Sequence, residues 1–174
     1  MEIRQLHKNE FEKFNEIDRR EIIKNIYYHR DGKLELEDEY HDVPEWTPAM
    51  KQEFINDFIE LNKRGGFVYA MFDGNKVAGM GTLDIKFIGK NNDQLQLAGL
   101  WVSNQYRKAG VATRLVEHMK EKARELGAKK LYVSATPSLN TITFYQNRGF
   151  TVTDDVNQEL FEKEPEDIHM ELTL

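Results

Sequence analysis

The stretch from Leu95 to Ala135 constrains the fold more than any other part of the chain. Residues 95–102 (LQLAGLWV) form an apolar strand pattern, and residues 130–135 (KLYVSA) form a second one. Between them, Gly110 to Leu126 has apolar residues at helical spacing, on one face at Val111, Leu115, Met119 and Ala123. A strand, a helix and a strand in this order predict a parallel strand pair joined by a right-handed crossover.

The rest of the sheet is expected to be antiparallel. Residues 67–72 lead through the turn Asp73-Gly74-Asn75 into a strand from Lys76 to about Phe87, which is the pattern of a β-hairpin. Three more strands are expected, at 1–6, 150–154 and 168–173. A short helix is expected at 139–147. Gly99 lies inside the 95–102 strand, either as a plain strand residue or at a β-bulge.

The first third of the chain has a less regular pattern. Asn9 to about Ile26 has apolar residues near helical spacing and is predicted to be a helix. Residues 27–48 are predicted to form a loop or a short hairpin over one face of the protein. A second helix is expected to start at Pro48 and to stop at Gly65-Gly66. The predicted fold class is therefore mixed α/β, with helices on both faces of the sheet.

Length and composition limit the classes of protein to which this chain can belong. With 174 residues, 40% of them hydrophobic, it is expected to be a single domain spanning 1–174. The absence of cysteine excludes disulfides, thiolate metal sites and cysteine nucleophiles, and it agrees with a cytoplasmic location. A net charge of −6 disfavours nucleic acid as the main ligand, because binding to phosphates needs a basic face. No apolar run approaches the roughly 20 residues of a membrane span, and the N-terminus lacks the form of a signal peptide.

The turn between the 95–102 strand and the following helix is the most informative segment for function. The first backbone N–H groups of a helix have no partner within the helix, and the helix dipole adds positive charge at this end. A tight turn that enters a helix can therefore bind a phosphate. Gly110 leaves the backbone accessible, Ala112 is small, and Arg107 and Lys108 add positive charge. The sequence patterns of a P-loop and of a dinucleotide-binding fold are absent.

The sequence Arg107-x-x-Gly110-x-Ala112, directly after an apolar strand, resembles the cofactor signature of the GCN5-related N-acetyltransferase (GNAT) superfamily. Tyr145, followed by Gly149-Phe150, resembles the second landmark of that superfamily. The resemblance covers residues 67–174 and is weak over the residues before them. It implies a mostly antiparallel mixed sheet in which the parallel strands splay apart. It also implies acetyl-coenzyme A (acetyl-CoA) as the co-substrate, with no metal.

The resemblance further implies where the co-substrate binds. The backbone of residues 100–102 would pair with the pantetheine arm, and an N–H near Val102 would polarise the thioester carbonyl. The pyrophosphate would lie on the N–H groups around Gly110. The complete set of implied contacts is Leu100, Trp101, Val102, Arg107, Lys108, Ala109, Gly110, Val111, Ala112, Thr113, Ser138, Asn140 and Tyr145. Ser138 stands where many relatives have asparagine, so either Ser138 or Asn140 makes that contact, or Ser138 only caps the following helix.

The chemistry implied by the resemblance is direct attack of a neutral amine on the thioester while both substrates are bound. Tyr145 is the candidate acid that protonates the departing thiolate, because a tyrosine hydroxyl has a reference pKa of about 10 and is protonated near neutral pH. The base that accepts the proton of the amine has no clear match in the sequence, and Asp84 is the nearest candidate. The reserve candidates for the base are Glu21, Glu37 and Glu39.

No motif identifies the acceptor. The acidic segment 35–45 indicates either a cationic acceptor or a solvated acidic loop. A small cationic amine, a peptide lysine and a peptide N-terminus all fit the first interpretation. The alternative function is a non-catalytic acyl-CoA-binding sensor, which would need the 107–112 turn but not Tyr145. A homodimer that pairs through strands in 150–174 is a further expectation from the resemblance.

Overall fold

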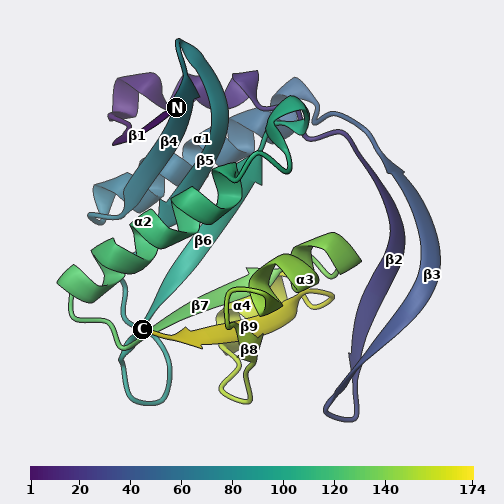
Figure 1. The fold of residues 1–174 in the computed structure, drawn as a ribbon. Coiled ribbons are helices and arrows are strands. Elements are labelled where there is room, and N and C mark those ends of the chain that lie inside the picture. The colour runs from purple at the N-terminus through teal and green to yellow at the C-terminus, as the bar shows by residue number, and fades with distance from the viewer.

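The computed structural model describes residues 1–174. A seven-stranded sheet runs through it in the order β1-β4-β5-β6-β7-β9-β8 (Figure 1). Its strands are β1 (Glu2–Gln5), β4 (Phe67–Asp73), β5 (Lys76–Leu83), β6 (Gln94–Val102), β7 (Lys130–Ala135), β8 (Thr151–Val152) and β9 (Ile168–Thr173). Only β6 and β7 are parallel, and every other neighbouring pair is antiparallel. The predicted parallel pair and the mostly antiparallel mixed sheet are therefore confirmed.

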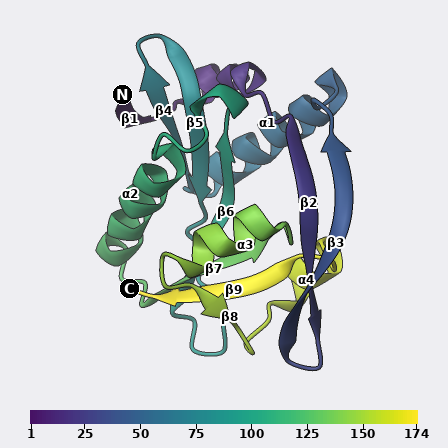
Figure 2. The same ribbon diagram turned by 45° about the vertical axis from the view of Figure 1, so that its right-hand side comes forward.

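Helices cover both faces of this sheet. They are the 3-10 helices η1 (Lys8–Glu16) and η2 (Asn104–Tyr106) and the α-helices α1 (Pro48–Lys63), α2 (Val111–Glu125), α3 (Leu139–Gln146) and α4 (Gln158–Lys163). One buried core contains Leu115 of α2 and Ile142 of α3, and a second contains Phe14 of η1 and Phe58 of α1. Figures 1 and 2 show α2 and α1 on opposite sides of β4, β5 and β6. None of the helices is both long and apolar enough to cross a bilayer.

The helix α2 begins and ends close to the predicted residues because a glycine marks each end. Gly110 and Gly127 have φ of +79° and +89°, a left-handed conformation that glycine adopts without steric cost. The face predicted to be apolar is buried. The helix α1 likewise starts at the predicted Pro48. The hydroxyl of Thr47 before it accepts the Met50 N–H at 3.2 Å, which is a typical N-cap.

The first third of the chain differs most from the prediction. The helix predicted from Asn9 to Ile26 is wrong beyond Glu16, because η1 is followed by the strand β2 (Glu21–Arg30). The strand β3 (Lys33–Val43) pairs with β2 in a separate two-stranded sheet. The isoleucines of this segment fit helical spacing, but β-branched side chains favour a strand once a partner strand is available.

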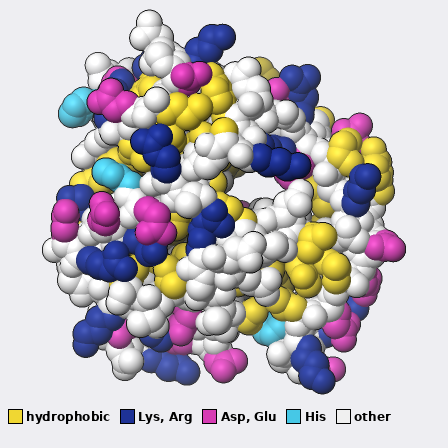
Figure 3. Space-filling view, viewed as in Figure 1, with side chains coloured by type: hydrophobic (Ala, Val, Ile, Leu, Met, Phe, Trp, Pro, Cys, Tyr) yellow, Lys and Arg dark blue, Asp and Glu magenta, His cyan; other side chains and the backbone are white.

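The strands β2 and β3 together form a long hairpin, here called the arm, in place of the expected loop or short hairpin. It turns at Asp31-Gly32, both with left-handed backbones. The arm stands off the body of the protein and returns to it near α3 (Figures 1 and 2). There the Tyr27 N–H donates to Pro137 O at 2.7 Å. A space-filling view shows an opening between the arm and the body (Figure 3).

Smaller differences occur at other element ends. The strand β5 ends at Leu83 and not at Phe87, β8 is only Thr151–Val152, and α4 was not predicted. The apolar alternation continues after Leu83 through Ile85 and Phe87, but the chain turns there, where the Lys86 N–H donates to the Asp84 carboxylate. The segments of β8 and α4 are polar, and apolar periodicity gives little information about their local structure.

The glycine inside β6 marks a bulge, as one of the two interpretations of the sequence predicted. Thr82 of β5 lies opposite Gly99, but the next residue, Leu83, lies opposite Leu97. Ala98 is therefore the extra residue of a β-bulge. A Cβ atom on Gly99 would lie 2.0 Å from the Trp101 ring, so only glycine allows this ring to cover the bulge.

Candidate functional site

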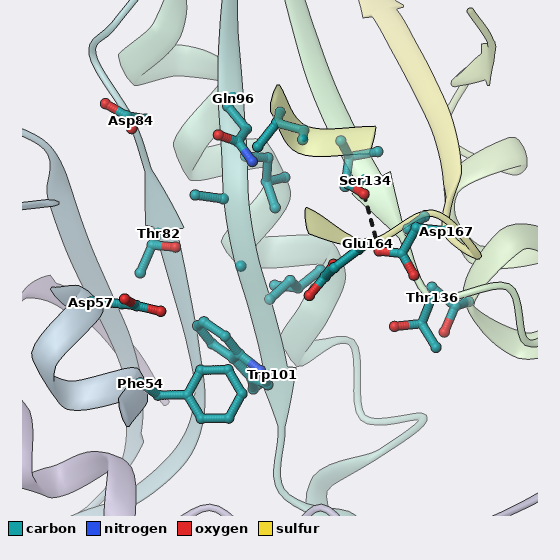
Figure 4. Close-up of a pocket in the computed structure, with 18 of the residues that line it drawn as sticks. Phe54, Asp57, Thr82, Asp84, Gln96, Trp101, Ser134, Thr136, Glu164 and Asp167 are labelled. Atoms are coloured by element: carbon teal, nitrogen blue, oxygen red, sulfur yellow. Dashed lines mark hydrogen bonds between the residues drawn. The ribbon is translucent and has the colours of Figure 1, made fainter. Parts of the chain in front are cut away.

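The parallel strands β6 and β7 diverge along their length. They are paired only where Gln94–Gln96 lie beside Lys130–Tyr132, and beyond that point each strand pairs only with its other neighbour. A cavity of about 1010 Å³ lies at the divergence, lined by residues 96–102 of β6 and 133–136 at the end of β7 (Figure 4). The splay that the resemblance implied is therefore present, and it opens into this cavity.

Alternate backbone amides of β6 face the open side of the splay. Ser103 N–H donates to Ala78 O of β5 at 3.0 Å. Because successive N–H groups of a strand point to opposite edges, the N–H groups of Leu100 and Val102 point away from β5 and toward the splay. Leu100, Trp101 and Val102 all line the cavity. The geometry thus leaves free donors where the pantetheine arm and the thioester carbonyl were predicted to bind.

The turn that enters α2 presents a run of free backbone donors. The amides of Lys108, Gly110, Val111, Ala112 and Thr113 make no hydrogen bond within the chain. Gly110 is the N-cap of α2, and no atom lies within 4 Å of the position that a Cβ on it would occupy. Left-handed φ at both Lys108 (+63°) and Gly110 (+79°) curls this backbone into a concave turn. Such an arrangement of amides at a helix N-terminus suits a phosphate.

The cationic side chains of the turn have different surroundings. The Arg107 guanidinium donates to Arg19 O at 2.8 Å and to Arg20 O at 3.1 Å, and it lies 3.7 Å from a Glu21 carboxylate oxygen. Arg107 therefore anchors the start of the arm to the turn, while it also lines the cavity. Lys108 and its neighbour Ala109 are both exposed. Contacts of these side chains with a cofactor remain predictions.

Tyr145 lies on α3 in the wall of the cavity, as the resemblance implied. It is only 4% exposed and packs edge-on against Phe150, with ring centroids 5.1 Å apart. Its hydroxyl makes no hydrogen bond within the chain. Burial raises the pKa of Tyr145, so its hydroxyl stays protonated at neutral pH. A group of this kind can donate a proton to a leaving thiolate, and that role remains a prediction.

Asp84 also borders the cavity, but its carboxylate is already engaged. Arg64 donates to it from Nη2 at 2.6 Å and from Nε at 3.1 Å and 3.2 Å, and the Lys86 N–H donates at 3.1 Å. Burial raises the pKa of Asp84, but the bonds from Arg64 and the backbone outweigh it, so the net shift of the pKa is downward. A carboxylate held ionised by an arginine is a weak proton acceptor, so its predicted catalytic role gains no support from its surroundings.

The reserve candidates divide between the cavity and the arm. Glu21, at the start of β2, lines the cavity. Glu37 and Glu39 lie on β3 outside the cavity wall, where Glu37 pairs with Arg30 at 2.5 Å and Glu39 accepts the Tyr28 hydroxyl at 2.6 Å. The structure therefore brings only Glu21 of the three to the site.

Ser138 and Asn140 occupy different positions at the start of α3. Ser138 is buried, and its Oγ accepts the Thr141 N–H at 3.3 Å and donates to Thr141 Oγ1 at 2.9 Å. It is the N-cap of α3, which is the capping interpretation of the sequence. Asn140 is exposed, lines the cavity and donates to Glu21 at 3.5 Å. Of the two, Asn140 is the one whose side chain is accessible to a ligand.

Two carboxyl groups that the sequence analysis did not identify also face the cavity. Asp167 and Glu164 lie between α4 and β9, and the Ser134 Oγ donates to Asp167 Oδ2 at 3.0 Å (Figure 4). Burial, followed by the hydrogen bond and the charge of Glu164, raises the pKa of Asp167 to about 7, and Ser134 opposes this shift. Only the long-range pairing of β7 with β9 brings Asp167 to Ser134, so no local sequence signal indicated it.

The comparison with protein families agrees with this geometry. The model described as "Acetyltransferase (GNAT) family" matches residues 23–150, which is most of the chain. N-acetyltransferase 8 of Homo sapiens is 28% identical over 115 residues, covering 62% of this chain and 51% of that protein. N-acetyltransferase 8B of Rattus norvegicus is 33% identical over 95 residues, covering 53% of this chain and 43% of that protein. The chain thus spans about half the length of the curated relatives it matches.

Solved structures resemble the whole chain, including the first third. A nourseothricin acetyltransferase superposes with a TM-score of 0.72 at 16% identity, covering 99% of this chain and 97% of that one. The PaiA N-acetyltransferase of Thermoplasma acidophilum, solved with coenzyme A, gives 0.63 at 15% identity, covering 99% and 98%. At such identities these structures show the fold alone. The family match over residues 23–150 decides the assignment, and the chain belongs to the GNAT family of acetyltransferases.

Proposed function

We propose that this chain transfers an acetyl group from acetyl-CoA to a primary amine of a small cationic acceptor, with both substrates bound together. The observation that carries the proposal is the splay of β6 from β7, which leads directly to the open amides at the N-terminus of α2. Two structural neighbours support the identity of the donor. One was solved with coenzyme A and another, a GNAT-family acetyltransferase of Elizabethkingia anophelis, with acetyl-CoA bound.

In the proposed complex, each part of the donor meets a suitable part of the site. The pyrophosphate lies on the free amides of Lys108 and of residues 110–113, where the dipole of α2 adds to its attraction. The pantetheine amide groups pair with the free edge of β6. The thioester oxygen accepts the N–H of Val102, which stabilises the negative charge that develops there during attack.

The chemistry then needs only proton transfers and close approach. The amine nitrogen attacks the thioester carbon, so a C–N bond forms and the C–S bond breaks. The sulfur leaves as a thiolate and takes a proton from the Tyr145 hydroxyl, and the nitrogen loses one proton as the amide forms. Holding both reactants in one cavity contributes much of the rate, because the encounter becomes intramolecular.

The charge of the cavity favours a cationic acceptor. Seven acidic side chains line the cavity against five basic ones, of which Arg19 and Lys163 form no ion pair. Arg64 and Lys86 are paired with Asp84 and Glu159 at 2.6 Å and 3.4 Å. The carboxylates of three lining residues form no such pair, and these are Asp57, Glu164 and Asp167. In Figure 4, Asp57 lies near the rings of Phe54 and Trp101. Aromatic faces and carboxylates are the groups that bind ammonium ions.

The experiment is a turnover assay with acetyl-CoA and a panel of amines. The panel is spermidine, ethylamine, nourseothricin and a lysine-containing peptide, and the readout is thiol release together with the mass of the acetylated amine. The proposal expects acetylation of at least one small amine and weaker turnover of the peptide. Tight binding of acetyl-CoA without turnover of any amine would instead support the alternative function, a non-catalytic sensor.

A further inference from the structure

We propose that Asp167 is the group that accepts the proton of the acceptor ammonium, with Glu164 and Ser134 as its positioning residues. This inference rests on the proposed acetyl transfer and assigns the base that the sequence analysis left open. Its basis is the place of Asp167 in the cavity wall, the contacts of its carboxylate and the elimination of the other carboxylates that border the site.

The fold places Asp167 at the mouth of the splay. It directly precedes β9, which pairs along the whole of β7, so the carboxylate reaches the end of β7 at Ser134. Ser134 and Thr136 of this edge, together with Gln96 and Trp101 of β6, border the same cavity (Figure 4). An acceptor that approaches a thioester held between these strands therefore passes the Asp167 carboxylate.

Asp167, directly before β9, and Tyr145 of α3 line the same cavity. Besides burial, the negative charge of Asp167 makes a smaller contribution to the raised pKa of Tyr145. Tyr145 is the group expected to protonate the leaving sulfur. The proton acceptor and the proton donor of the reaction thus flank one space, which is the arrangement that the transfer requires.

The other carboxylates of the cavity have partners that weaken them as bases. Asp84 is held ionised by Arg64, and Glu21 lies 3.7 Å from Arg107. Glu60 pairs with Lys63 at 2.6 Å and Glu159 with Lys86 at 3.4 Å. Asp167 has no cationic partner, and its only side-chain donor is the neutral Ser134 hydroxyl. Asp57 also forms no ion pair, but it lies on α1, across the cavity from Ser134 and Asp167 (Figure 4).

The charged groups around Asp167 keep its carboxyl able to accept and release protons near neutral pH. Burial and Glu164 raise the pKa of Asp167 to about 7. On its other side, a second cavity is bordered by His29 and Arg30 of the arm and by Glu166 and His169. Of these, Arg30 is paired with Glu35 and Glu37, burial lowers the pKa of His169, and neither side chain forms an ion pair with Asp167.

The proposed step balances in charge and atoms. Ionised Asp167 takes one proton from the ammonium, which leaves a neutral amine with a free electron pair. That pair forms the C–N bond, and as the C–S bond breaks Tyr145 protonates the leaving sulfur. The nitrogen, positively charged after the attack, gives its second proton to the Tyr145 phenolate, which leaves a neutral amide and a neutral tyrosine. Protonated Asp167 then releases its proton to solvent, and the net reaction releases one proton.

The decisive variant is Asp167→Asn, which keeps the shape of the side chain and can still accept the Ser134 hydrogen bond. With ethylamine at pH 7, we expect kcat/KM to fall about 100-fold, with little change in the affinity for acetyl-CoA. With 2,2,2-trifluoroethylamine, which is already uncharged at this pH, the deficit should almost disappear. Asp154→Asn, an exposed aspartate on the loop before α4, is the matched control and should behave as wild type with both amines.

The pH profile separates a base from a merely structural residue. Activity should rise with pH as Asp167 ionises. Glu164→Gln removes a neighbour that raises the pKa of Asp167, so this rise should shift to lower pH. Ser134→Ala removes a hydrogen-bond donor that lowers the pKa of Asp167, so the rise in activity should shift to higher pH. Glu166→Gln changes an exposed glutamate in the same segment. It is the control and should leave the pH dependence of activity unchanged.

The outcomes distinguish this inference from the function on which it rests. Equal losses with both amines in Asp167→Asn, or an unchanged pH profile in the Glu164 and Ser134 variants, would overturn the role of Asp167 and leave acetyl transfer intact. A wild-type protein that binds acetyl-CoA but acetylates neither of these amines nor any in the panel would overturn the proposed function, and this inference with it.

Discussion

Tyr145 shows how burial can prepare a single residue for acid catalysis. Its hydroxyl makes no internal hydrogen bond, and burial raises its pKa, so it stays protonated throughout the neutral range. We expect Tyr145→Phe to lower kcat on the order of 100-fold, with an unchanged affinity for acetyl-CoA and nearly unchanged thermal stability. Steady-state kinetics and calorimetry measure these quantities. Tyr40→Phe on the exposed arm is the control, and a Tyr145→Phe enzyme of normal kcat would exclude Tyr145 as the acid.

Asp84 and Arg64 are expected to contribute to stability more than to catalysis. Asp84 is 6% exposed, and its removal would leave Arg64 without its main partner. We expect Asp84→Asn to lower the free energy of unfolding by about 1–2 kcal/mol at pH 7, since Arg64 is itself half-exposed. The folded-state pKa of Asp84 lies below its ordinary value. The stabilisation by ionised Asp84 is therefore fully present above the pKa that Asp84 has in the unfolded chain. It is lost as the pH falls through the pKa that Asp84 has in the folded protein.

Urea denaturation at neutral and at strongly acidic pH tests this ion pair. The difference in the free energy of unfolding between wild type and Asp84→Asn should disappear at the acidic pH, where residue 84 is uncharged in both proteins. A difference that persists there would mean that the side chain stabilises the fold by packing and not by its charge. Loss of the pH-dependent rise in activity, with stability unchanged, would restore Asp84 as the candidate base.

At the scale of elements, the arm is the part of the fold that depends on a few polar contacts. Arg107 ties its first residues to the turn before α2 through the carbonyls of Arg19 and Arg20. The side chain of Asn104 also donates to Arg20 O, at 2.6 Å. We expect Arg107→Gln to raise the rate of amide hydrogen exchange across β2 severalfold, because the arm loses two of its contacts at that end. Lys108→Gln, which removes the neighbouring charge and no arm contact, should leave the exchange unchanged. Equal exchange in both variants would mean that Asn104 and the contacts near α3 hold the arm without Arg107.

The elements also show what the sequence could predict. The helix α2 and its entering turn were predictable because the spacing of Leu115 and Met119 and the glycines at both ends are local signals. The strand β2 was mistaken for helix because its isoleucines fit both periods, and only pairing with β3 decides between them. Asp167 could not be connected to Ser134, because that contact depends on the pairing of β7 with β9.

For the whole molecule, two separate cores hold the two faces of one sheet, and the site lies where that sheet opens. The cavity collects residues from α1, α3, α4, the arm and the middle strands. No single element contains the site, so its geometry depends on the complete fold. The predicted homodimer and cytoplasmic location stay predictions. Light scattering of the purified protein tests the first, and a mass near 20.5 kDa would contradict it.

The central claim is that the open amides at the N-terminus of α2 bind the diphosphate of a coenzyme A thioester. Calorimetric titration of acetyl-CoA into three proteins tests it most directly: wild type, Gly110→Val and Gly127→Val. Both glycines have left-handed backbones and open space at the Cβ position, at opposite ends of the same helix, so both variants carry the same backbone strain. The account predicts clear binding by wild type and Gly127→Val, and an affinity at least about tenfold lower for Gly110→Val, or ~1.4 kcal/mol. No binding by wild type, or equal binding by all three, would contradict it.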